Sequence, residues 1–357
     1  MKTLILTEGG SVSGNGHITR CLSFCHELIS KGAAPVLVIK PDQTGEAAVL
    51  ETVNITGLAV EQFDWHDLKK LKDFTAHFIG GIRSSEQKKD ATRNGTGNIK
   101  CGLNVIADSY KADFDVYAYL CDISDNQIFF DDYNRIDYPG GHVLNGAVSA
   151  AKIAYAGGRG VNYLLGPSYQ PIRIEFANSS PVKIKKKVLK VLITLGGSDS
   201  DEVCKRILEA LVEKFADIEK KIVTGRPLNG LEEIKKNAGE NAHFHSGLSA
   251  AQMAALMSES DIAVSAGGQT LYELARLGVP TIAFIMAENQ RNNVNGFLEL
   301  RAVENGGESA DSGFENKIAR AMAGLISCDR RRELSEIFRK IVDGQGVSRC
   351  IKEVFTL

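Results

Sequence analysis

The chain has 357 residues, 43% hydrophobic and 24% charged, which is enough for two domains with separate cores. A formal net charge of −2 argues against nucleic acid or an anionic membrane as the main partner. We find no charged-then-apolar leader and no apolar run near ~18 residues, so we expect a cytoplasmic protein without a membrane span. The seven cysteines are odd in number and scattered, and we expect them to be small apolar residues in a reducing compartment.

The first half alternates short apolar runs with helical patterns, which predicts parallel strands covered by helices on both faces. We expect strands at residues 3–7, 34–40, 77–80, 103–107, 127–131 and 143–145, and helices at residues 17–32, 46–52 and 65–73. The strand at 77–80 and those after it have weaker patterns than the first two.

The second half repeats the alternation more clearly. Strands are expected in "VLKVLITLGG", "KKIVTG", "DIAVSAG" and "PTIAFIM", with helices in "SDEVCKRILEALVEKF", "LSAAQMAALMSES" and "QTLYELARLG", and further helices to the end. The predicted fold class is therefore α/β, with two doubly wound Rossmann-like domains facing across a cleft. We expect domains at 1–168 and 189–357, a linker at 169–188, and a last helix able to pack back on the N-terminal domain.

Both halves contain a strand that ends in Gly-Gly, followed by a small polar residue and a helix. Residues 9–11 read "GGS", and residues 196–198 read the same within "LGGSDSDE". Glycines let the backbone approach an anion, and the N-terminus of the next helix presents N–H groups and a positive dipole end. The alternative is that Ser198 and Asp199 only cap the helix.

A second glycine-rich helix start lies at residues 265–280, "SAGGQTLYELARLGVP". Gln269 and Thr270 open this helix, whose N–H groups and Thr270 hydroxyl could hold a diphosphate. Glu273 lies about one turn further on the same face and could reach two adjacent ribose hydroxyls. The alternative for Glu273 is a first-turn acid favoured by the helix dipole.

Polar residues also follow other predicted strands, at the edge where ligands of α/β sheets bind. The segment "IMAENQRNN" (285–293) carries amides that can read sugar hydroxyls and acetamido groups, or form a polar loop with a helix cap. Asp108 ends "VIAD" and could orient a base or bind a sugar. Asp131 and Asp132 follow another strand, and we favour loop formation for both.

The segment "TEGGSVSGNGHITRCLSF" (7–24) places His17 where a loop passes into a helix. His17 could belong to a phosphate loop, act as a catalytic base, or be a solvated turn residue. The segment lacks the Lys-Ser/Thr of a P-loop and resembles a dinucleotide fingerprint only loosely. The remaining histidines are expected to be surface or packing residues, and no metal-ligand spacing is present, so we expect no metal and no cofactor.

Several segments taken together resemble one family. These are "GNGHITRCLSF", "DSY", "YLLGPSYQPIRIEF", "TLGGSDSDE", "GLSAAQMAALMSESDIAVSAGGQTLYELARLGVP" and "ENQRNN". They are similar to the UDP-sugar hydrolases of the pseudaminic acid pathway and their spore-coat-polysaccharide relatives, which have the GT-B fold. The resemblance covers most of the chain in order, although residues 41–100 match only loosely. It implies a UDP-sugar substrate, attack of water on the anomeric carbon with inversion, and no metal.

The resemblance also implies roles for individual residues. His17 would be the base or orienter of the water, supported by Asp108 and Tyr110. Residues implied to bind the substrate are Gly14, Gly16 and Arg20 on the sugar side, Gly196, Gly197, Ser198, Gly267, Gly268, Gln269, Thr270 and Glu273 around the nucleotide, and Asn289 and Gln290 at the sugar. A positioned histidine typically contributes ~10²–10⁴-fold as a general base.

Two other functions remain open at this point. The same scaffold could transfer the sugar from UDP to an acceptor in polysaccharide synthesis, or it could bind a nucleotide sugar without turnover. Epimerases of the same fold are a further alternative. In each case we expect a UDP-sugar ligand and a monomer or weak oligomer.

Overall fold

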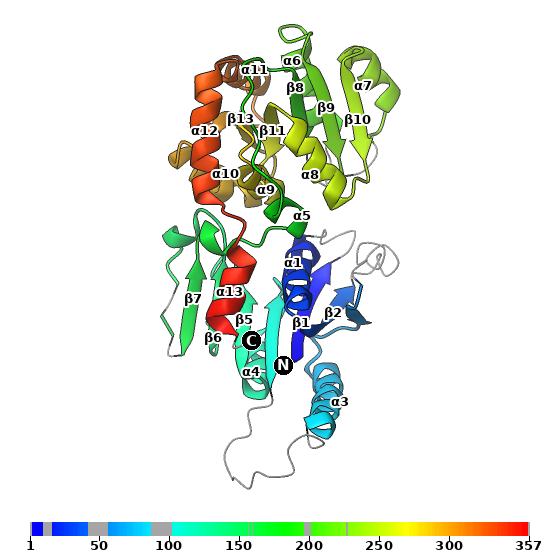
Figure 1. The fold of residues 1–357 in the computed structure, drawn as a ribbon, viewed down its shortest axis with the longest axis vertical. Coiled ribbons are helices and arrows are strands. Elements are labelled where there is room, and N and C mark those ends of the chain that lie inside the picture. Colours follow the sequence, from blue (N-terminus) through cyan, green and yellow to red (C-terminus); the bar gives the residue numbers. More distant parts are fainter. Residues whose placement is uncertain are drawn as a thin grey trace. The chain divides into compact units, whose positions relative to one another are not determined.

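The structure, a computed structural model, describes residues 2–9, 16–41, 56–86, 102–155, 157–158, 160–195, 201–225 and 228–355. The chain forms two compact units, each built on its own parallel sheet. Unit 1 comprises Met1–Pro171 and Gln345–Leu357, and unit 2 comprises Ile172–Gly344. The expected α/β class with two doubly wound, Rossmann-like domains is confirmed (Figure 1).

Unit 1 is a seven-stranded parallel sheet in the order β3-β2-β1-β4-β5-β6-β7 (Figure 1). Its elements are β1 (Lys2–Gly9), α1 (Gly16–Ser30), β2 (Ala34–Pro41), β3 (Ala59–Gln62), α3 (Leu68–Glu86), β4 (Leu103–Asp108), α4 (Phe114–Ile123), β5 (Asn126–Phe130), β6 (Gly141–Asn145), η1 (Ala150–Lys152), β7 (Val161–Leu165), η2 (Pro167–Tyr169) and α13 (Gly346–Val354). The β1 strand, in the middle of this sheet, is buried over nearly its whole length.

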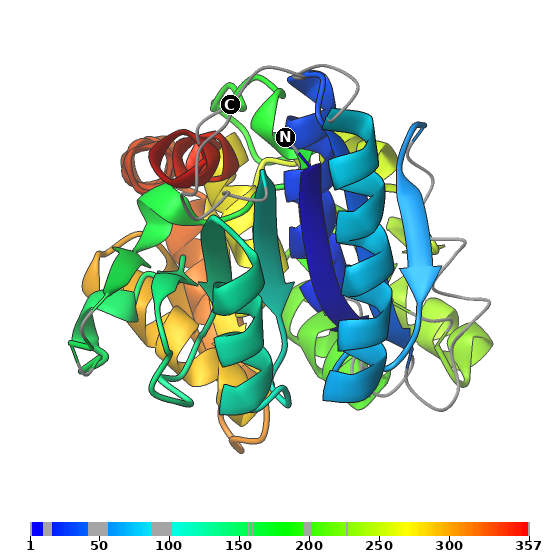
Figure 2. The same cartoon turned by 90° about the horizontal axis from the view of Figure 1, so that it is seen from below.

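Successive side chains of a strand point to opposite faces, and both faces of the unit 1 sheet are covered. Ile5 packs with apolar residues of α1 and α13, whereas Leu4 and Leu6 pack with those of α3 and α4. Figure 2 shows α3 and α4 on the same side of β1. This explains why β1 reads as a continuous apolar run rather than an alternating one.

The α13 helix completes the core of unit 1 although it follows unit 2 in the sequence. Its residues Val347, Cys350 and Ile351 are buried against α1 and the sheet. Gly346 lies so close to Gln170 that an added Cβ would be 2.3 Å from the Gln170 carbonyl oxygen. The α13 helix is therefore packed into unit 1 as closely as the elements that precede unit 2 in the sequence.

Unit 2 is a six-stranded parallel sheet in the order β10-β9-β8-β11-β12-β13. Its elements are α5 (Ile174–Ala177), β8 (Lys190–Thr194), α6 (Asp201–Val212), β9 (Glu219–Thr224), α7 (Leu231–Ala238), β10 (Ala242–Ser246), α8 (Ala250–Glu259), β11 (Ile262–Ala266), α9 (Gln269–Leu277), β12 (Thr281–Ile285), η3 (Glu288–Gln290), α10 (Arg291–Glu299), β13 (Glu304–Glu308), α11 (Phe314–Leu325) and α12 (Cys328–Ile341). One apolar cluster joins its strands to α6, α7 and α11, and α8, α9 and α10 lie against β8, β11 and β12.

Two expectations for the first half need comment. The strand expected at 77–80 is wrong, because these residues belong to α3. Leu71, Phe74 and Phe78 recur at helical spacing and pack on the core, and a short apolar run alone does not distinguish a strand from a buried helix. The helix expected at 65–73 is confirmed in α3, which continues to Glu86. The helix expected at 46–52 lies outside the described residues.

The described cysteines are all free, and Cys21, Cys25, Cys204 and Cys350 are buried. Burial raises the pKa of the Cys25 thiol to about 12, so this side chain is an uncharged thiol at neutral pH. No helix in the described ranges is both long and apolar enough to cross a membrane.

Each sheet has one point at which the chain reverses its direction of strand addition. In unit 1 this point lies between β1 and β4, and in unit 2 it lies between β8 and β11. Open α/β sheets bind ligands beyond the carboxyl ends of the strands at such points. The segments that follow β1, β4, β8 and β11 are therefore the first places to look for a site.

Candidate active site

A histidine–carboxylate pair lies at the switch point of unit 1. His17 is the second residue of α1 and is buried, and Asp108 is the last residue of β4. His17 Nδ1 lies 2.6 Å from Asp108 Oδ1. Because the carboxylate can only accept, we assign the imidazole proton to Nδ1, which leaves Nε2 as an acceptor in the neutral ring. This is the arrangement that a general base requires.

Arg20, one turn after His17, ties this pair to a second carboxylate. Its guanidinium donates Nε to Asp108 Oδ2 and Nη2 to Asp108 Oδ1 (2.7 Å), while Nη1 donates to Asp132 Oδ2 (2.8 Å). Burial alone would raise the pKa of Asp108, but Arg20 and His17 lower it below its usual range. Asp108 is therefore ionised at neutral pH and holds both α1 side chains. Arg20 Nη2 is also 3.3 Å from His17 Nδ1, whereas Asp108 Oδ1 is 2.6 Å from the same nitrogen.

Tyr110 completes the cluster from the loop after β4. Its hydroxyl donates to Asp132 Oδ2 (2.5 Å), and its ring meets the His17 ring edge-on with centroids 4.3 Å apart. Its backbone N–H donates to Glu8 Oε1 at 2.9 Å. Burial and the Asp132 carboxylate raise the pKa of Tyr110, so the phenol keeps its proton. Tyr110 is thus a hydrogen-bond donor to Asp132, and its ring contacts the His17 imidazole.

A second cluster of polar side chains, linked to Tyr110 through Glu8, includes His66. Lys40 Nζ lies 3.0 Å from His66 Nδ1, and Ser109 Oγ lies 3.0 Å from His66 Nε2. The Glu8 carboxylate that holds Tyr110 is 3.5 Å from the same Nε2. Since the Lys40 ammonium can only donate, Nδ1 accepts and Nε2 carries the proton. Burial and the Lys40 charge lower the pKa of His66 to about 4.

The shifted pKa of His66 predicts acid sensitivity. The unfolded chain has a histidine pKa of about 6.5, so on acidification it binds this proton before the folded protein does. We expect the free energy of unfolding to fall by about 1–2 kcal/mol between pH 8 and pH 5, and this loss to be smaller in His66→Gln. Urea unfolding at both pH values measures it. An equal loss in the variant would assign the acid sensitivity to other groups.

In unit 2, the turn between β11 and α9 is held by side chains of η3 and α10. Gln290 Oε1 accepts from the backbone N–H groups of Gly267 (3.3 Å) and Met286 (3.0 Å), and Asn293 Nδ2 donates to the Gly267 carbonyl at 3.2 Å. Gly268 precedes α9 and provides no side-chain cap. The first turn of α9 is therefore a candidate site for an anion.

The two glycines of this turn are not equivalent. A Cβ at Gly267 would lie 2.3 Å from Val294 Cγ2, whereas a Cβ at Gly268 would meet nothing within 4 Å. We expect Gly267→Ala to destabilise the protein by about 1–3 kcal/mol through overpacking. Gly268→Ala, the matched control, should cost less than about 1 kcal/mol, the range of a cap effect. Urea unfolding without ligand compares them, and equal losses would contradict the close packing of Gly267.

Glu273 does not lie in the first turn of α9, which was the alternative considered for it. Its side chain is buried in α9, where Arg173 Nε donates to Oε1 (2.6 Å) and Arg173 Nη2 donates to Oε2 (2.8 Å). Burial raises the pKa of Glu273 although Arg173 opposes the shift. In this structure both carboxylate oxygens are therefore engaged within unit 2. A role for Glu273 at a ribose stays a prediction.

The structure places the expected site residues as follows. His17, Arg20, Asp108 and Tyr110 are brought together in unit 1. In unit 2, Gly267, Gly268, Gln269, Thr270 and Gln290 lie at one turn, and Asn289 is exposed in η3 nearby in sequence. Gly16 is exposed at the start of α1. The expected residues outside the described ranges are Gly14, Gly196, Gly197 and Ser198.

Sequence reasoning did not single out Glu8 or the His66 group, and it favoured loop formation for both Asp131 and Asp132. Asp131 does form the loop as expected, accepting from the backbone N–H groups of Tyr133 and Arg135. Asp132, its neighbour, instead accepts from Arg20 and Tyr110. The only sequence signal for this role of Asp132 was its position after a predicted strand. Among the described residues, no group of three or more His, Cys, Asp or Glu is placed to hold a metal ion.

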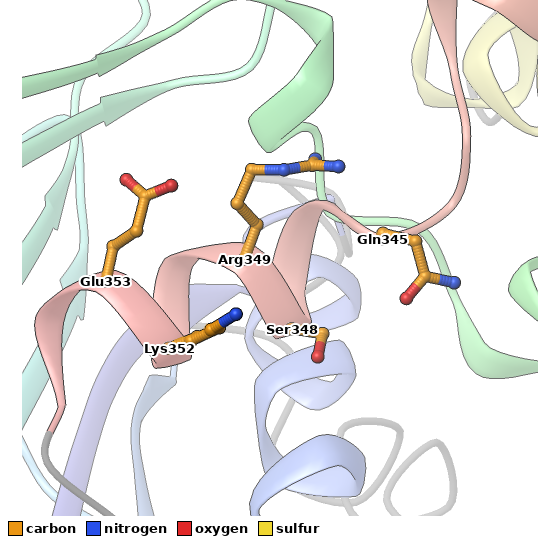
Figure 3. A pocket seen from close by; sticks show the side chains of 5 residues that line it. All are labelled: Gln345, Ser348, Arg349, Lys352 and Glu353. Carbon is orange, nitrogen blue, oxygen red and sulfur yellow. The ribbon is translucent and has the colours of Figure 1, made fainter.

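A separate open pocket lies along α13, away from the His17 group. It is lined by Gln345, Ser348, Arg349, Lys352 and Glu353 (Figure 3). Arg349 donates to the Ser168 carbonyl, and Tyr169 donates its hydroxyl to Glu353 at 3.0 Å. These two hydrogen bonds anchor α13 to η2 within unit 1.

Doubly wound α/β proteins bind ligands beyond the carboxyl ends of their strands, and both units of this chain carry polar groups at their switch points. Residues 190–309 match the family described as glycosyltransferase family 28 C-terminal domain. The chain is 32% identical over 148 residues to the Helicobacter pylori pseudaminic acid cytidylyltransferase and UDP-2,4-diacetamido-2,4,6-trideoxy-beta-L-altropyranose hydrolase, covering 42% of this chain and 26% of that protein. It is 28% identical over 194 residues to a Bacillus subtilis spore coat polysaccharide biosynthesis protein, covering 53% of this chain and 55% of that protein.

Solved structures show the same architecture over the whole chain. MurG of Acinetobacter baumannii superposes with a TM-score of 0.63 at 13% identity, covering 99% of both chains. The chain therefore has the GT-B fold, and its residues 190–309 are similar to a glycosyltransferase domain. The matched residues make up 26% of the Helicobacter pylori protein and 55% of the Bacillus subtilis protein.

Proposed function

We propose that the protein hydrolyses a UDP-linked diacetamido-trideoxy sugar at its anomeric C–O bond, with inversion, for nonulosonic (pseudaminic) acid synthesis. The observation that carries the proposal is the His17–Asp108 pair, which leaves Nε2 of the imidazole as an acceptor. The Helicobacter pylori relative supports the substrate class, because its name includes a hydrolase of such a sugar. The resemblance stated for the "GNGH" and "AGGQT" segments supports the same assignment.

In the proposed reaction, a water oxygen attacks the anomeric carbon while His17 Nε2 accepts one water proton. The bond from that carbon to the diphosphate oxygen breaks, and its electron pair leaves with UDP. Asp108 stabilises the imidazolium that forms and keeps Nδ1 protonated throughout. Unit 2 would hold the UDP part, with N–H donors of the α9 start stabilising the charge that develops on the diphosphate.

Oxygen-18 water tests the proposal directly. The protein is incubated with the UDP-diacetamido-trideoxy sugar in labelled water, and both products are analysed by mass spectrometry. Label in the free sugar and none in UDP supports attack at the anomeric carbon. Label in UDP means attack at phosphorus and overturns the proposal.

Glycosyl transfer is the second candidate function, favoured by the match of residues 190–309 to a glycosyltransferase family. The same imidazole would then deprotonate an acceptor hydroxyl instead of water. In the labelled-water experiment this function predicts no UDP release until an acceptor is added. A protein that binds UDP and releases nothing with any acceptor would be a non-catalytic binding protein.

A further inference from the structure

Two adjacent tyrosine rings are exposed, and one of them contacts His17. Tyr110 follows β4 and Tyr133 follows β5, and their side chains are 40% and 49% exposed. The ring centroids are 5.4 Å apart with the planes tilted by 58°. Adjacent exposed aromatic rings at the carboxyl ends of neighbouring strands are an apolar surface where ligands of this fold bind.

Hydrogen bonds fix both residues of this pair. Tyr110 is held through its hydroxyl by Asp132 and through its backbone N–H by Glu8. Tyr133 is held by its backbone N–H, which donates to Asp131 Oδ1 at 2.9 Å. The next residue, Asn134, has a φ of 56°, which turns the chain back sharply. The Tyr110 ring and the backbone of Tyr133 are therefore fixed before binding, which lowers the ordering cost of recognition.

The chemistry of this surface differs from that of the polar groups beside it. The Asp132 carboxylate and the Arg20 guanidinium suit hydroxyl and amide groups, but the ring faces offer no strong hydrogen-bond partner. A methyl or C–H face of a sugar gains contact on such rings. A hydroxyl placed there would lose its hydrogen bonds to water and gain none from the rings, which costs free energy.

We propose that Tyr133 determines substrate specificity. With Tyr110 it forms an aromatic surface that binds the deoxygenated, methyl-bearing part of the sugar next to His17. The inference rests on the proposed function and deepens it, since it names the feature that selects a deoxy sugar over an ordinary hexose. Tyr133 takes no part in proton transfer.

Binding of non-hydrolysable analogues tests this inference. The probes are two UDP N-acetyl sugars with a methylene group in place of the anomeric oxygen, one with a methyl and one with a hydroxymethyl on C5. Isothermal titration of the full chain should show tighter binding of the methyl analogue, by about fourfold for one buried methyl. Tyr133→Ala should weaken it by about tenfold and abolish the preference.

Two control variants distinguish the loss of the Tyr133 ring from a general loss of folding or binding. Tyr133→Phe keeps the ring and should keep the preference. Phe114→Ala removes another aromatic that is 49% exposed, on α4, and should change neither affinity. UDP alone should bind equally to all variants.

The outcomes distinguish the inference from the proposed function. If Tyr133→Ala binds both analogues as the unmodified protein does, the specificity role is overturned while the proposed function stands. An equal loss for both analogues and for UDP would also overturn it, because the effect would then be on folding. If the unmodified protein binds neither UDP nor the analogues, the proposed function fails and this inference fails with it.

Discussion

His17→Asn is expected to slow UDP release by at least ~100-fold, the low end of a general-base contribution. The Asn amide can still donate to Asp108, as Nδ1 does, so the carboxylate keeps a partner. The variant has no acceptor in the place of Nε2, so the attacking water loses its base. Steady-state kinetics measure the effect, and the dissociation constant of UDP should stay unchanged.

His26→Asn is the matched control, because His26 lies on the same helix outside the cluster. It should keep normal turnover. If His17→Asn also keeps near-normal turnover, His17 is not the base, and another acceptor must be sought in unit 1. If neither variant nor the unmodified protein turns over while all bind UDP, binding without catalysis is the better function.

Asp108→Ala is expected to have the largest effect on stability. It leaves the Arg20 guanidinium, which is only 14% exposed, with Asp132 as its remaining carboxylate partner. Removing one partner of a buried ion pair costs about 3–5 kcal/mol, and we expect about 3 kcal/mol because Asp132 remains. Urea unfolding at pH 7 measures the full contribution, because stability from a lowered carboxyl pKa is lost only as pH falls below about 3.9.

Asp108→Asn separates the catalytic effect from the folding effect. It keeps the shape of the side chain, but its NH₂ group can donate to His17 Nδ1, which moves the ring proton to Nε2. Since Nε2 then cannot accept, turnover of the folded variant should fall by ~10³–10⁴-fold, as for other histidines with the wrong tautomer. Normal turnover in a folded Asp108→Asn protein would contradict the tautomer assigned here.

The alternation of strands and helices could be predicted because each pattern is local. The strands at 3–7 and 34–40 are found as β1 and β2, since buried parallel strands give continuous apolar runs. Four short strands, β3, β7, β10 and β13, were not predicted. The burial along β3 alternates between exposed and intermediate, and β13 reads "ENGGE", so neither has an apolar run to recognise.

The candidate site could be predicted only in part, because its contacts join distant residues. Residues at strand ends were found by their position, but Arg20 and Asp132 are 112 residues apart and no local pattern pairs them. Glu273 shows the same limit in unit 2. Its place in the helix after the glycine turn follows from the local pattern, but its partner Arg173 is 100 residues earlier. Pairing of charges depends on topology, which propensity and periodicity do not specify.

The position of α13 has a consequence for synthesis of the chain on the ribosome. Val347, Cys350 and Ile351 fill the unit 1 core only after the whole of unit 2 has been translated. At ~5–20 residues per second, residues 172–344 take roughly ten to thirty seconds to emerge. During this interval the α1 face of the first sheet lacks its last apolar cover. Unit 1 can therefore complete its core only after unit 2 has been synthesised, and until then nascent unit 1 exposes the apolar surface that α13 later covers.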